Sequence, residues 1–153
     1  MNTGEFVSYF KEEFFIPELQ SKKKEAVLEE LLQPLVDAKL IKSPGLVYET
    51  LLNRETLGST GIGKQVAIPH CRTLAIPEIC IVVGISQKGI DFKAVDGQKV
   101  NLFFLILGPP LDESNQYLPI LGKLCEMLRN TKFKDKLVQV ESYEKFVKLL
   151  MKG

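Results

Sequence analysis

Cysteine is scarce in this sequence of 153 residues, and its three occurrences are far apart. Cys71, Cys80 and Cys125 form no C-x-x-C pair, and an odd number of thiols cannot all pair within one chain. This pattern argues against a disulfide framework. A reducing cytoplasm is therefore the expected location.

Long hydrophobic runs and an excess of one charge are lacking as well. The most apolar stretch, residues 100–111, is much shorter than the roughly 20 residues that a membrane-spanning helix needs. Glu5, Lys11 and Glu12 interrupt the apolar pattern of the N-terminus, so no signal peptide is expected. Twenty basic and 19 acidic residues give a net charge of +1, which offers no electrostatic reason to expect nucleic acid as a partner. We expect neither nucleic-acid binding nor membrane insertion.

Two apolar runs define the predicted core of the fold. Residues 79–85 and 101–107 are rich in β-branched and aromatic side chains and continuously hydrophobic, as strands buried on both faces are. A turn is expected between them at Asp96-Gly97. No repeat or low-complexity tract divides the chain, so we expect one domain over residues 1–153. The predicted class is α/β, with helices covering both faces of a central sheet.

Helices are predicted on either side of these strands. Ser21 is expected to cap a helix over residues 22–40, and Pro34 to kink it or end it early. A second helix is predicted over residues 45–57, with Gly58 as a left-handed C-terminal cap.

Two further helices are predicted after the second strand. The first presents an apolar stripe made by Leu118, Leu121, Leu124, Cys125 and Leu128. The last begins after Ser142 and carries Tyr143, Phe146, Val147, Leu149 and Leu150.

The segment 54–72, RETLGSTGIGKQVAIPHCR, carries most of the chemical information. Residues 58–64 fit the phosphate-loop pattern G-x-x-x-x-G-K, but Gln65 stands where a Ser or Thr would bind magnesium. Such a loop follows a strand and opens a helix. Here the preceding residues are predicted to be helical and the following ones extended, so a nucleoside triphosphatase is disfavoured.

His70 is the only histidine and the candidate nucleophile of this segment. Pro69 restricts the backbone, which places His70 at the rigid end of a short strand. A neutral imidazole can attack phosphorus, and Arg54 offers a planar cationic fork to phosphoryl oxygens. Further phosphate donors are expected from the Gly-rich turn, from Ser59, Thr60, Gly61 and Gly63. From the residues alone, a structural histidine and an ordinary turn remain as alternatives.

The order Arg54-Glu55, then residues 58–63, then residues 67–70 resembles the active-site segment of the enzyme IIA components of the bacterial phosphoenolpyruvate-dependent phosphotransferase system. The similarity is to the fructose, mannitol and nitrogen-regulatory branch, and it extends over nearly the whole chain. The resemblance implies an α/β domain with a mixed sheet flanked by helices. It implies that His70 accepts a phosphoryl group from HPr or an HPr-like carrier, with Arg54 stabilising the group and no cofactor or metal required.

The resemblance leaves the next step of such a relay open. The group passes to a IIB domain, or the phosphorylation state governs binding to a regulatory protein. Many relatives carry a second active-site histidine where this chain has Tyr117, an auxiliary hydrogen-bond donor at best. This departure favours a regulatory role. A pure binding module without phosphoryl transfer, and a metal site combining His70 with the cysteines, are the alternatives, the second of them disfavoured by spacing.

Overall fold

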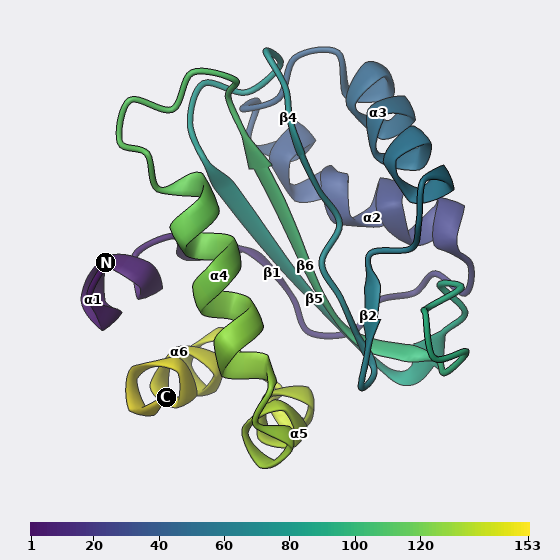
Figure 1. The fold of residues 1–153 in the computed structure, drawn as a ribbon, viewed down its shortest axis with the longest axis vertical. Coiled ribbons are helices and arrows are strands. Elements are labelled where there is room, and N and C mark those ends of the chain that lie inside the picture. Colours follow the sequence, from purple (N-terminus) through teal and green to yellow (C-terminus); the bar gives the residue numbers. More distant parts are fainter.

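The computed structural model describes residues 1–153 and contains one six-stranded mixed sheet between two layers of helices (Figure 1). The strands are β1 (Phe10–Ile16), β2 (Gly61–Gly63), β3 (Val66–Ala67), β4 (His70–Arg72), β5 (Cys80–Ile90) and β6 (Val100–Gly108). The helices are α1 (Thr3–Val7), α2 (Lys24–Asp37), α3 (Pro44–Thr56), α4 (Tyr117–Leu128), α5 (Thr131–Gln139) and α6 (Tyr143–Lys152). The predicted α/β class is confirmed. No helix is both long enough and apolar enough to span a bilayer.

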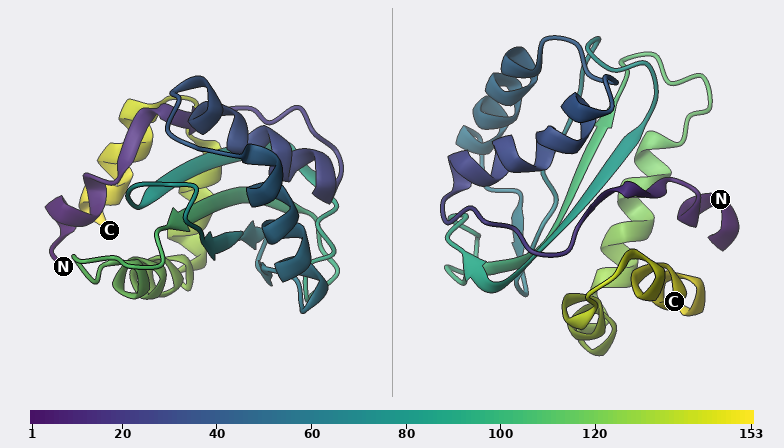
Figure 2. Two further views of the ribbon diagram at one scale, coloured as in Figure 1. Left: turned by 90° about the horizontal axis from the view of Figure 1, so that it is seen from above. Right: turned by 180° about the vertical axis from the view of Figure 1, so that it is seen from behind.

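The two central strands, β5 and β6, pair antiparallel and are buried on both faces. Their side chains alternate between two cores. Phe103, Leu105 and Leu107 of β6 face α2 and α3, whereas Leu102, Phe104 and Ile106 face α4, α5 and α6. Figure 2 shows α2 and α4 on opposite sides of the sheet. The predicted doubly covered strands are confirmed, and β5 is longer than expected. The turn at Asp96-Gly97 is present, with Gly97 at φ +73°.

The sheet order is β1-β5-β6-β3-β2, and β4 pairs with β6 beyond β3. Val66 lies opposite Leu102 and His70 opposite Ile106, both parallel and with the same offset along the chain. β3 and β4 are therefore one strand line, interrupted at Pro69, which has no N–H to donate. His70 begins β4, so the expectation that it ends a strand is wrong.

The start of α2 differs from the prediction. The helix begins at Lys24, and Ser21 does not cap it. Instead the Ser21 N–H and hydroxyl both donate to Oε1 of Glu30, at 2.9 and 2.6 Å. The Glu30 carboxylate, about two turns into the helix, is therefore the hydrogen-bond partner of Ser21. The expected capping bond to the first turn of the helix does not form. The helix passes Pro34 and ends at Asp37, about one turn later.

The ends of α3 and α6 agree with the sequence-based predictions better than the buried face of α4 does. α3 matches its predicted range to within a residue, but Gly58 has φ +150°, outside the αL well near +57°, so it is not a left-handed cap. α6 starts after Ser142 as predicted, and the Ser142 hydroxyl accepts from the Lys145 N–H. The predicted stripe of α4 is partly wrong, because Leu118 and Cys125 are exposed. The buried face is formed by Tyr117, Ile120, Leu124 and Leu128.

α1, β1 and α5 were not predicted. β1 reads FKEEFFI, and its two buried phenylalanines belong to different cores: Phe10 packs on the side of α4, α5 and α6, and Phe14 on the side of α2 and α3. Residues four apart in a regular strand share a face, but the register of β1 against β5 shifts between Phe10 and Phe15. This shift hides the alternation by which a strand is recognised. α5 is short and polar on most of its surface.

Candidate active site

A depression of about 620 Å³ lies beside β4, between the last turns of α3 and the first residue of α4. β4 contributes His70, Cys71 and Arg72, α3 contributes Arg54, and α4 contributes Tyr117. Three of the predicted site residues, His70, Arg54 and Tyr117, therefore meet at one cavity. Two arginines and no carboxylate line it, so it is suited to an anion.

His70 is half-buried, and its ring is oriented by the backbone. Nδ1 lies 2.7 Å from the carbonyl oxygen of Ile68. A carbonyl only accepts hydrogen bonds, so this contact places the imidazole proton on Nδ1. In the neutral ring, Nε2 then carries the free lone pair.

The guanidinium of Arg54 has only one hydrogen bond within the protein. Its Nη1 donates to the carbonyl oxygen of Gly58 at 2.9 Å, and no carboxylate lies within 4.0 Å of it. An arginine has five N–H donors, so four remain for a ligand. The bond to Gly58 holds the side chain against the end of α3.

Arg72 lines the same cavity and was not predicted as a site residue. Residues i and i+2 of a strand project to the same face, so Arg72 lies on the side of the sheet to which His70 projects. The alternation of side chains along a strand could have identified Arg72, which is two residues after His70. It could be used only once β4 was known to extend beyond the histidine.

Tyr117 is buried at the start of α4. Its N–H and that of Gln116 donate to Oδ2 of Asp112, at 3.0 and 2.7 Å, which fixes the first turn of the helix. Burial, and secondarily the nearby Cys71 thiol, raises the pKa of Tyr117 to about 12, while Arg72 opposes the shift. The phenol is thus neutral at physiological pH.

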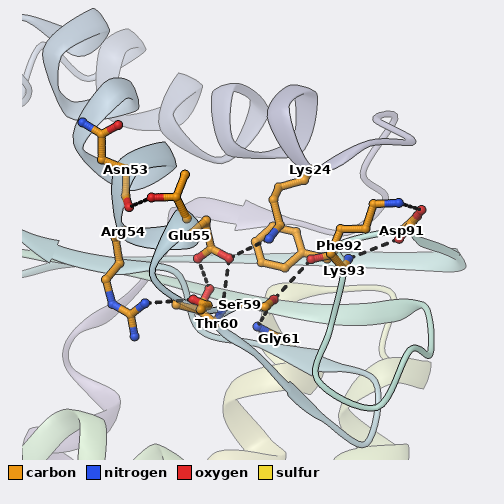
Figure 3. Close-up of polar contacts among 12 residues, drawn as sticks. Lys24, Asn53, Arg54, Glu55, Ser59, Thr60, Gly61, Asp91, Phe92 and Lys93 are labelled. Atoms are coloured by element: carbon orange, nitrogen blue, oxygen red, sulfur yellow. Dashed lines mark hydrogen bonds and ion pairs between the residues drawn. The ribbon is translucent and has the colours of Figure 1, made fainter.

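The Gly-rich loop is held by a buried carboxylate (Figure 3). Oε1 of Glu55 accepts from the Thr60 N–H at 3.0 Å and pairs with the Lys24 ammonium at 3.0 Å. The Thr60 hydroxyl donates to Oε2 of the same carboxylate. Glu55 therefore ties α2, the end of α3 and the start of β2 together. Its role was missed, because a glutamate in a helical pattern gives no sign of burial.

The other predicted phosphate donors lie outside the cavity and have partners within the protein. The Ser59 hydroxyl donates to the carbonyl oxygen of Phe92 at 3.2 Å and accepts from the Gly61 N–H at 3.0 Å. Gly63 has φ +95° and packs beside Asp96. A direct contact of Ser59, Thr60, Gly61 or Gly63 with phosphate stays a prediction.

The context expected for residues 58–64, with a helix before them and extended chain after them, is confirmed. Lys64 and Gln65 have φ values of +56° and +69° and form the tight turn of the β2–β3 hairpin. The glycines thus follow a helix and enter a hairpin, whereas a nucleotide loop follows a strand and opens a helix.

Cys71 borders the cavity, and burial raises its pKa to about 11. Cys80 is buried on β5 and Cys125 is exposed on α4. No three His, Cys, Asp or Glu side chains gather in a way that could hold a metal ion.

Comparison with known families matches residues 8–153 to the family described as phosphoenolpyruvate-dependent sugar phosphotransferase system, EIIA 2. The fructose-specific EIIABC component of Bacillus subtilis (strain 168) is 32% identical over 132 residues, which cover 86% of this chain and 21% of that protein. The chain thus spans about a fifth of that relative. The fructose-specific EIIA component of Haloferax volcanii is 34% identical over 119 residues, which cover 78% of this chain and 77% of that protein.

A nitrogen regulatory protein of Bradyrhizobium diazoefficiens is 34% identical over 129 residues, which cover 82% of this chain and 80% of that protein. Among solved structures, nitrogen regulatory protein IIA-Ntr from Neisseria meningitidis has a TM-score of 0.86 at 27% identity, covering 95% of this chain and 99% of that one. IIA mannitol from Escherichia coli shares the fold, with a TM-score of 0.76 at 19% identity over 92% of this chain and 98% of that one.

Proposed function

Since the chain belongs to the EIIA 2 family of the phosphoenolpyruvate-dependent sugar phosphotransferase system, we propose that His70 is its phosphoryl acceptor. The observation that carries the proposal is the 2.7 Å contact between Nδ1 and the Ile68 carbonyl, which leaves Nε2 free to attack. In the step, the N–P bond of a phosphohistidine on an HPr-type carrier breaks and its electron pair returns to the carrier's imidazole. The lone pair of Nε2 forms the new N–P bond.

Arg54 stabilises the transferred group in this proposal. Phosphoryl transfer asks a protein mainly for positioning and for charge stabilisation. A guanidinium with four unused donors at a cavity without carboxylates supplies both. In this proposal Ser59, Thr60, Gly61 and Gly63 hold the loop that carries the Gly58 carbonyl, beside the direct phosphate contact that the sequence predicts for them. Tyr117 acts as an uncharged auxiliary residue.

The phosphoryl group then passes to a IIB domain, or its presence controls binding to a regulatory protein. A solved complex of IIA mannitol with phosphorylated IIB mannitol from Escherichia coli has a IIA chain of the same fold, at 18% identity and a TM-score of 0.77. The regulatory role is favoured by the similarity to IIA-Ntr. We also propose that residues 1–153 form one domain of this type and that it works in the cytoplasm, where its three free thiols stay reduced.

The test is a relay assay. The full chain is incubated with labelled phosphoenolpyruvate, enzyme I and an HPr-type carrier, beside the His70→Ala variant. We expect one acid-labile phosphoryl group on the wild type and none on the variant. An unlabelled wild type, or equal labelling of both proteins, would refute the proposal. Adding a purified IIB domain to the labelled protein then separates the two roles, because only a transport component loses its label quickly.

A further inference from the structure

Arg72 lies across the sheet from a residue that has no side chain. β4 and β6 pair so that Arg72 is opposite Gly108. A Cβ on Gly108 would lie 2.5 Å from Cδ1 of Tyr117, which no packed structure tolerates. The missing side chain therefore makes a slot on β6, and the Tyr117 ring fills it.

The ring in this slot supports the Arg72 guanidinium. Cζ of Arg72 lies 4.4 Å from the centroid of the Tyr117 ring, within the range of a cation–π contact. Tyr117 itself is fixed by burial and by the hydrogen bond of its N–H to Asp112. Arg72 is thus oriented although it is exposed.

The charge of Arg72 is unused within the protein. No carboxylate lies within 4.0 Å of it, and its one hydrogen bond runs from Nη1 to the carbonyl oxygen of Pro110 at 3.3 Å. Arg72 follows His70 by two residues in β4, so their backbones are about 6.6 Å apart and their side chains project from the same face. A long side chain at that spacing reaches a group attached to the neighbouring imidazole.

From this arrangement we propose that Arg72 is a second phosphoryl-binding cation, positioned by the Tyr117 ring in the Gly108 slot. It rests on the proposed function of His70. Arg54 comes from α3 and Arg72 from β4, and both line the cavity beside His70. Arg72 stabilises the negative charge on the oxygens during transfer, and Tyr117 positions it without touching the group.

The experiment measures the rate of phosphoryl acceptance from the labelled carrier over a range of carrier concentrations. Arg72→Gln is expected to lower the limiting rate by about 100-fold, in line with the loss of one donor at a transition state. Arg72→Lys keeps the charge but loses the planar fork, so it recovers part of the rate. Arg129→Gln removes an exposed arginine from the end of α4, outside the cavity, and is the matched control with an unchanged rate.

The positioning role of Tyr117 has its own pair of variants. Tyr117→Phe keeps the ring that supports Arg72 and loses only the hydroxyl, so its limiting rate should exceed that of Tyr117→Leu by about threefold or more. Tyr117→Leu removes the ring while leaving every charge in place, and should lower the limiting rate at least tenfold. Thermal melting of each variant confirms that it is folded, and His70→Ala provides the blank.

The outcomes separate this inference from the proposed function. A labelled wild type with an unchanged rate in Arg72→Gln overturns the inference alone. The inference is also overturned if Arg72→Gln changes only the half-saturating carrier concentration and not the limiting rate. Arg72 would then be a contact for docking the carrier. Equal rates in Tyr117→Phe and Tyr117→Leu overturn the positioning role. A wild type that takes no label refutes the proposed function itself.

Discussion

The Lys24 ammonium lies 3.0 Å from Oε1 of Glu55, where the Glu55 side chain is buried and the Lys24 side chain is largely buried. Lys93 and Asp91 form an ion pair of the same length on the surface, where both side chains are more than half exposed. The two pairs therefore differ in their surroundings and not in their separation. Buried charges depend on their partners far more than exposed ones.

Glu55→Ala should accordingly destabilise the protein by about 3–5 kcal/mol, since it leaves a buried ammonium and the Thr60 N–H and hydroxyl without their acceptor. Lys93→Ala breaks the exposed pair and should leave the free energy of unfolding nearly unchanged. Urea unfolding monitored by circular dichroism measures both free energies. Similar costs for the two variants would mean that the buried carboxylate is not what holds the loop.

Gly61 is predicted to be required by close packing. A Cβ at this position would lie 2.8 Å from Cβ and 2.9 Å from Cα of Ala94, and the second of these is backbone that cannot move aside cheaply. Gly61→Ala should therefore destabilise the protein by about 1–3 kcal/mol. Gly45→Ala is the matched control, because nothing lies within 4 Å of its Cβ and it sits in the first turn of α3. It should be neutral or stabilising by up to about 1 kcal/mol, and thermal melts of the two variants should shift in opposite directions or differ clearly in size.

Asp112 should stabilise the protein in a pH-dependent way. The hydrogen bond from the Ser114 hydroxyl, together with those from the Tyr117 and Gln116 N–H groups, holds the pKa of Asp112 below its ordinary value, against an opposing effect of desolvation. A lowered folded-state pKa means that the carboxylate stabilises the fold above about pH 4, and that this is lost as the pH falls through the folded-state pKa.

Asp112→Ala should therefore cost about 1 kcal/mol at pH 7, as the loss of a helix cap does, and much less at pH 2.5. Unfolding curves at the two pH values measure the difference. Glu113→Ala, at an exposed neighbour, is the control and should be indifferent to pH at this level. A cost for Asp112→Ala that does not change with pH would contradict the capping role of its carboxylate.

The three thiols should differ sharply in reactivity. Burial raises the pKa values of Cys71 and Cys80 to about 11, so roughly one in a thousand is a thiolate at pH 8. Iodoacetamide should modify the exposed Cys125 first. Mass spectrometry of digested protein should find the rate at Cys71 rising about tenfold for each pH unit between 7 and 10. Cys125→Ser should lack the fast phase, and fast labelling of Cys71 in that variant at pH 7 would contradict its burial.

From the amino-acid sequence one can predict the architecture around the central strands, and His70 stands out as the candidate nucleophile. Residues 79–85 and 101–107 are continuously apolar, as strands buried on both faces are, and the predicted helices supply the cover. The ordered motif from Arg54 to His70 marked the chemical segment. Helices α3 and α6 followed from periodicity and end signals, because both features are local.

The residues that surround His70 could be identified only in the folded chain. Arg72 and Tyr117 are far apart in the chain and meet because the β4–β6 register puts Arg72 opposite Gly108, whose missing side chain admits the ring. Lys24 and Glu55 likewise meet through the packing of α2 against α3. The register shift that hides β1, and the choice of which apolar face of α4 is buried, also arise from long-range packing. Local sequence patterns carry no information about contacts between residues far apart in the chain. These features could therefore be recognised only in the folded structure.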